Sequence, residues 1–143
     1  MSDTLDEQHA SVALDLLEAN AALSGRVHDG EVPAGATRPY VLVYTDVRWP
    51  PGDEGMANAI DHASVTCRTT WYVHCVAESA AAVRQLTGQV RTSLLDASPL
   101  VVPTARACAR LTEDDAQPPV KDETTGTTVF DGVLIFSMIS VPG

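Results

Sequence analysis

The residues that could ligate a metal ion or act as thiol nucleophiles are few in this sequence. They carry imidazole or thiol groups, and they are His9, His28, His62, His74, Cys67, Cys75 and Cys108. None is arranged as C-x-x-C or H-x-x-x-H, the spacings that bring two ligands to one ion. Cys67 and Cys75 share a face of a predicted strand, but they are separated by about 27 Å at ~3.4 Å per residue. The sequence therefore predicts no metal site, and the odd number of widely spaced cysteines favours buried thiols in a reducing cytosol.

Catalytic patterns are equally sparse. No G-x-S-x-G motif is present, and the pairs His28-Asp29 and Asp61-His62 are chain neighbours, whose side chains seldom face each other. A phosphate site needs a glycine-rich turn before a helix, whereas the sequence before the second predicted helix carries Glu78, which would repel an anion. We therefore predict no catalytic residue and no cofactor.

Clusters of carboxylates occur in three segments that are predicted to be loops: Asp53-Glu54, Glu113–Asp115 and Asp122-Glu123. Paired carboxylates can perform acid–base chemistry, and that alternative stays open. Because no aromatic platform accompanies them, a solvated acidic rim is the favoured interpretation.

The remaining candidates point to protein–protein contact. Trp49 stands in a proline-rich segment, where an exposed aromatic side chain could anchor an interface, although it could also fold back onto the sheet edge. Half of the arginines fall in one predicted helix and one predicted strand: Arg84, Arg91, Arg106 and Arg110. If the fold gathers them, they form a basic face opposed to acidic loops that include Asp114 and Asp115. Such a split suits head-to-tail assembly, and scattered solvated charges are the alternative.

Length and charge limit the possible classes of protein. The chain has 143 residues, with 9 basic and 19 acidic side chains, so its formal net charge is −10. We expect one domain over residues 1–143. The acidic balance argues against gripping nucleic acid or docking on an anionic membrane. No apolar run reaches the ~20 residues of a membrane span, and the acidic start is unlike a signal peptide.

Apolar periodicity predicts two helices. The first covers about Leu5 to Ser24, capped by Thr4 with Glu7 three residues later. Its expected apolar stripe is Leu5, Val12, Leu16, Ala19 and Leu23. The second begins after the N-cap Ser79 and ends near Leu95. Its expected inward stripe is Val83, Leu86, Val90 and Leu94.

Strands are predicted between and after these helices. A short extended piece follows Val27, an apolar strand covers Tyr40–Tyr44, and alternation predicts a strand from Ala63 to Val76. A further strand lies within residues 100–111, and a final long strand runs from Val129 to Val141. Residues 46–61 and 113–126 are expected to be long loops or arms. The order of elements predicts an α+β fold, with a largely antiparallel sheet and both helices packed on one face.

The order of these segments resembles the tail-terminator, or tail-completion, family of long-tailed bacteriophages. Four sequence segments, flanking the two predicted helices, carry the resemblance: Arg26–Pro33, Arg38–Val41, Trp71–Val76 and Phe130–Ser137. The resemblance covers most of the chain. Its patterns are turn residues and apolar runs, and the segment from Asp46 to Asp61 is longer than the family pattern.

The resemblance implies a structural virion protein, not an enzyme, located at the tail–neck junction and assembled in the host cytoplasm. Such subunits close into a homohexameric ring that caps the tail tube and joins it to the head connector. The implied partners are further copies of the chain, the major tail tube protein and a connector or neck protein. DNA would pass through the channel without specific binding, which an acidic lining favours. The alternatives are another neck or head-closure subunit and, from a different class, a small cytosolic enzyme or ligand-binding domain.

Overall fold

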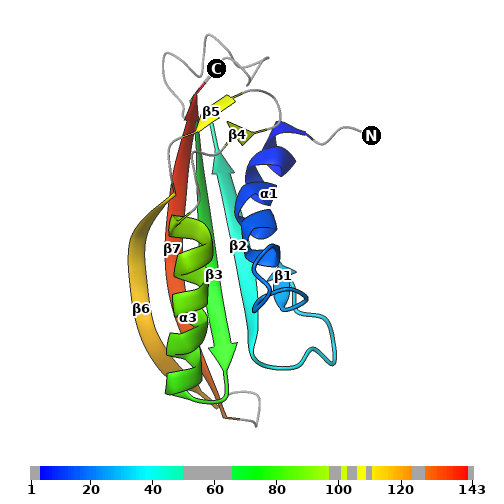
Figure 1. Ribbon diagram of the computed structural model, residues 1–143, viewed down its shortest axis with the longest axis vertical. Coiled ribbons are helices and arrows are strands. Elements are labelled where there is room, and N and C mark those ends of the chain that lie inside the picture. The colour runs from blue at the N-terminus through cyan, green and yellow to red at the C-terminus, as the bar shows by residue number, and fades with distance from the viewer. Residues whose placement is uncertain are drawn as a thin grey trace.

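The computed structural model describes residues 4–49, 66–96, 101–102, 106–108, 111–123 and 128–141. Within these residues, two helices lie against one face of a sheet (Figure 1). The helices are α1 (Leu5–Glu18) and α3 (Ala80–Leu95). The strands are β1 (Val27–Asp29), β2 (Tyr40–Arg48), β3 (Cys67–Ala77), β4 (Val101–Val102), β5 (Arg106–Cys108), β6 (Thr112–Asp122) and β7 (Val129–Val141). The predicted α+β fold is confirmed.

The sheet follows the order β1-β2-β3-β7-β5-β4, and β6 also pairs with β7. Every pairing is antiparallel except that of β1 with β2. Because β3 occupies one side of β7, both β5 and β6 lie along the other side, with β5 beside the last residues of β7 and β6 beside the rest. In Figure 1, β6 is the outermost strand on its side and curves away from the other strands.

Both helices begin where the sequence predicts. The hydroxyl of Thr4 accepts a hydrogen bond from the Glu7 amide at 3.2 Å, and that of Ser79 accepts one from Ala82 at 3.1 Å. The second helix also ends at Leu95, as expected. The first ends at Glu18, earlier than predicted, because residues 19–25 form a turn that closes at Gly25, where φ is +78°. Glycine adopts this left-handed conformation at no steric cost.

The core lies between the helices and the inner face of the sheet. Alternate residues of β3 are buried as predicted, and Trp71 is the largest of them. The predicted stripe of α3 is also confirmed, since its four apolar residues are buried. The predicted stripe of α1 is only partly confirmed. Val12 and Leu16 pack partly buried against the core, and Leu23, just after the helix, is buried. The buried residues of the helix itself are His9, Ala13 and Leu17, at steps of four.

Two strand predictions need correction. The arm expected at 113–126 is a strand over most of its length, because β6 pairs with β7 from Thr112 to Asp122. The loop expected at 46–61 begins later, since β2 continues to Arg48, and its part from residue 50 lies outside the described residues. In the described part of the chain, no helix has the length and apolar character to cross a membrane.

Candidate interaction surface

One face of the sheet carries no described helix, since α1 and α3 both cover the other (Figure 1). We call it the open face. Its residues come from β2, β3 and β7 and include Tyr40, Leu42, Tyr44, Asp46, Arg48, Arg68, Thr70, Tyr72, His74, Val133, Ile135, Ile139 and Val141. Large side chains remain exposed there: Tyr44 by 45%, Tyr72 by 38% and Ile139 by 46%. Clustered exposed aromatic and aliphatic groups are typical of a surface that contacts another protein.

A hollow of about 490 Å³ lies on the open face, at the end where β2 begins. Tyr40, Tyr44, His74, Asp122 and Asp131 contribute to its walls. The Nδ1 atom of His74 lies 3.1 Å from a carboxylate oxygen of Asp131, and the rings of Tyr44 and His74 meet edge to face at 5.5 Å. We call this the tyrosine hollow. Its wall combines aromatic faces with carboxylates, which together attract a cation.

A basic side chain also lines the tyrosine hollow but has its own partner. The guanidinium of Arg38 lies 3.8 Å from the carboxylate of Glu78. The charge of Arg38 is thus offset by a carboxylate outside the walls of the hollow.

A second hollow, of about 330 Å³, lies further along the open face. Two ion pairs border it: Arg48 with Asp46 at 2.7 Å, and Arg68 with Asp114 at 3.6 Å. Because these pairs are largely exposed, each adds at most about 1 kcal/mol to stability. This hollow is close to neutral and offers less to a charged partner.

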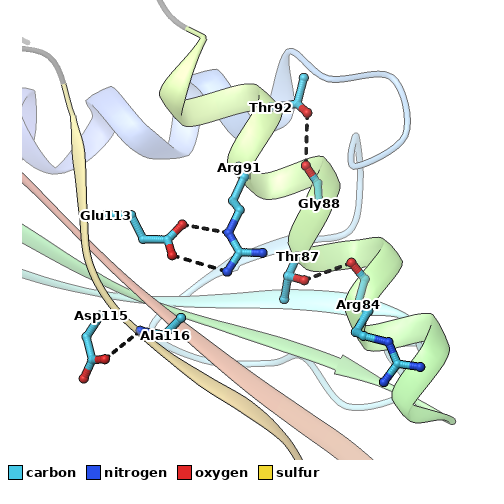
Figure 2. A network of polar contacts seen from close by, with 8 residues as sticks. All are labelled: Arg84, Thr87, Gly88, Arg91, Thr92, Glu113, Asp115 and Ala116. Atoms are coloured by element: carbon cyan, nitrogen blue, oxygen red, sulfur yellow. Dashed lines mark hydrogen bonds and ion pairs between the residues drawn. The ribbon is translucent and has the colours of Figure 1, made fainter.

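Helix α3 is joined to the edge strand β6 by a bidentate contact (Figure 2). The Nε and a terminal nitrogen of Arg91 donate to the two carboxylate oxygens of Glu113 at 2.7 and 3.3 Å. This hydrogen bonding raises the pKa of Arg91 above its usual value. Arg84 lies about two turns nearer the start of the helix than Arg91, and in Figure 2 its guanidinium points away from the Arg91–Glu113 pair.

A buried polar cluster joins α1 to the ends of β5 and β7. A carbonyl oxygen can only accept, so the Nδ1–H of His9 donates to the Leu5 carbonyl at 2.7 Å. The Nε2 atom then accepts from the hydroxyl of Ser140 at 2.6 Å. The Nε of Arg106 donates to the same hydroxyl oxygen at 3.1 Å. The three side chains are at most 2% exposed.

Trp49 closes this cluster at its outer side. Its indole N–H donates to Asp6 at 2.8 Å, its ring meets that of His9 edge to face at 5.5 Å, and Arg106 lies over the ring at 5.3 Å. The tryptophan therefore folds back onto α1 and β5, which was the alternative to an exposed anchor.

The Ser140–His9 contact has the geometry of a nucleophile and its base, but it cannot reach a substrate. Both residues are fully buried. Burial lowers the pKa of His9, and nearby Arg106 acts in the same direction, against the opposing effects of the Leu5 carbonyl and Asp6. The pair is thus a structural hydrogen bond with a neutral imidazole.

The buried thiols are also unsuited to nucleophilic chemistry. Burial raises the pKa of Cys67 to about 11 and that of Cys75 to about 12. Neither is a thiolate near neutral pH. Over the part of the chain that the structure describes, no three histidine, cysteine or acidic side chains gather as metal ligands would.

The sequence-predicted interface residues are dispersed. Arg106 is 2% exposed and faces the interior, so it does not join Arg84 and Arg91 in a basic face. Arg110 lies outside the described residues. Asp114 pairs with Arg68, and Asp115 is exposed on β6, where its side chain accepts from the Ala116 amide at 2.8 Å.

The sequence did not predict the open face as a candidate surface. Its signal is the alternation of Tyr40, Leu42 and Tyr44 with buried valines along β2, which gives one apolar face and one aromatic face. Asp131 and His74 become neighbours only because β7 pairs with β3.

Comparisons with known proteins found a similar fold among solved structures. A scan of protein-family models and a search of curated proteins found no match. Among solved structures, the fold is similar to a chain of the "Virion of native gene transfer agent (GTA) particle", with a TM-score of 0.67. The sequences are 19% identical, and the match covers 97% of this chain and 98% of the other. At this identity the match shows a shared fold.

Proposed function

We propose that this protein is a structural component of a phage-like virion. The observation that carries the proposal is the shared fold with a gene transfer agent virion chain over nearly the full length of both. A match over 97% of this chain is more informative than a match to one motif.

The proposed position is the end of the tail. In this proposal the chain acts as a tail terminator: its copies close into a homohexameric ring, which caps the tail tube and joins it to the head connector. The order of elements supports this role, since the helix, long strands and closing strand occur as the family resemblance requires.

The surface chemistry agrees with assembly more than with catalysis. The exposed aromatic residues of the open face suit a protein partner. The His–Ser contact is buried, and the Cys67 and Cys75 thiols are protonated near neutral pH. The proposed partners are further copies of the chain, the tube protein and a connector or neck protein, with DNA passing through an acidic channel.

Negative-stain electron microscopy of the purified full-length chain, alone and with tail tubes, tests this function. Rings with a central hole, bound at tube ends, are the expected result. A chain that remains monomeric by light scattering at all concentrations, and that ignores tubes, contradicts the proposal.

Another neck or head-closure subunit is the second candidate, because the gene transfer agent match names a particle and not a position within it. Binding assays with isolated tubes and isolated portal complexes separate the two. A terminator binds tube ends, whereas a head-closure subunit binds the portal.

A further inference from the structure

We propose that the tyrosine hollow of one copy receives the Arg84 side chain of the next copy. This inference rests on the proposed ring-forming function and names the contact that would build the ring. Two features of the structure carry it: an arginine whose guanidinium has no partner within the described residues, and an aromatic hollow that carboxylates line.

The cation is Arg84, on the outer side of α3. Every other arginine or lysine with a described side chain makes a hydrogen bond or ion pair, whereas Arg84 makes neither through its guanidinium within the described residues. The side chain is exposed and points away from Glu113 (Figure 2). The helix itself contains no acidic residue.

The receptor is the tyrosine hollow. Asp122 and Asp131 supply negative charge, while Tyr40 and Tyr44 supply ring faces against which a guanidinium can stack. His74 on β3 contacts Asp131 on β7 and Tyr44 on β2, and these contacts hold both side chains in place. A preorganised wall of this kind reduces the entropy lost when an arginine binds.

The positions of the two surfaces favour a head-to-tail contact. Helix α3 covers one face of the sheet, and the tyrosine hollow lies on the opposite face (Figure 1). A contact between two different surfaces of identical subunits repeats, and it closes into a ring when the rotation permits.

Lateral association of β6 with the α1 side of a neighbouring copy is disfavoured. Strand β6 carries Glu113, Asp114 and Asp115, and its adjacent prolines at 118 and 119 lack the N–H groups needed to extend a sheet. On the other side of the molecule, the charged residues of α1 are all acidic apart from its buried histidine. Approach of β6 to the α1 side of another copy brings like charges together, so we place the contact between the two faces.

Charge reversal in the full-length chain tests the contact. The variants are Arg84→Glu, Asp131→Lys, the double variant, and Arg26→Glu as a control with the same change in net charge. Arg26 is exposed and also lacks a described carboxylate partner, since its guanidinium donates to the Pro39 carbonyl at 3.0 Å. Asp122→Lys serves as a second receptor variant, at a different position in the wall of the hollow. Circular dichroism verifies that each variant folds, and sedimentation velocity over a concentration series measures association.

We expect Arg84→Glu and each receptor variant to weaken association about tenfold or more, with the control near the parent. The Arg84→Glu/Asp131→Lys double variant recovers part of the loss. If the parent assembles and Arg84→Glu assembles equally well, this contact is refuted while the proposed function stands. If the parent stays monomeric with and without tubes, both are refuted.

Discussion

Gly132 offers a sharp test of how closely α3 packs on the sheet. It is buried in β7, and a methyl group added at its Cα would lie 2.8 Å from a methyl carbon of Val83. This distance is shorter than ordinary carbon contacts of about 3.5–4.0 Å. The Gly132→Ala substitution therefore forces the valine side chain, or the helix that carries it, to move outward.

The cost follows from two opposing contributions. Overpacking a core typically costs about 1–3 kcal/mol. Replacing glycine restricts the unfolded chain and returns up to about 1 kcal/mol. The expected result is a loss of about 1–2 kcal/mol in the free energy of unfolding, measured by urea denaturation with circular dichroism.

Gly88 provides the matched control within α3. An added methyl there would meet nothing within 4 Å, so Gly88→Ala removes only the helix penalty of glycine and raises stability by up to about 1 kcal/mol. Val83→Ala completes the design, because it removes the clashing methyls. The Val83→Ala/Gly132→Ala double variant should lose less stability than the sum of the two single variants. The close contact between residue 132 and Val83 is refuted if Gly132→Ala is as stable as the parent. It is also refuted if the stability losses of the two single variants add up to that of the double variant.

Three further predictions concern groups elsewhere in the structure. Burial lowers the pKa of His9 below 6.5, so the unfolded chain binds the proton first as the pH falls. Stability is therefore full above pH 6.5 and falls as the pH drops toward the lower folded-state pKa. Urea midpoints measured from pH 8 to 5 should fall less in His9→Gln than in the parent protein. Arg91→Met should reduce stability by no more than about 1 kcal/mol, because its pair with Glu113 is partly exposed, and a larger loss at high salt contradicts a screened ion pair. Cys67 and Cys75 should react with iodoacetamide at pH 8 only after denaturation, as followed by mass spectrometry, and rapid labelling of the native protein contradicts their burial and raised pKa values.

The sequence predicts most elements but not which face of each strand is buried. In β7, residues of both parities are apolar, so alternation does not decide the inner face. The residues Val133, Ile135, Ile139 and Val141 share one parity and lie on the open side, whereas Leu134, Phe136 and Met138 are buried against the helices. The side that α3 covers determines the choice, and this information is not local.

The acidic segment before β7 shows a different limit. Its charges and prolines are typical of a loop, but they are also the residues that protect an exposed edge strand. Pairing along β7 makes β6 a strand despite its low strand propensity. Arg106 illustrates the same limit for the site, since its burial depends on Ser140, which is distant in sequence, and on the ring of Trp49.

Salt dependence distinguishes the proposed contact from general charge effects. Copies of a chain with a net charge of −10 repel one another, and this repulsion is long-range, so added salt should strengthen association of the parent protein. The Arg84 contact with the tyrosine hollow is short-range and attractive, so salt should weaken its contribution. The difference in association between the parent and Arg84→Glu should therefore be largest at low salt and shrink as the Debye length falls below about 10 Å. If the association constants of the parent and of Arg84→Glu change in parallel across the salt series, Arg84 acts without an opposite charge in the hollow.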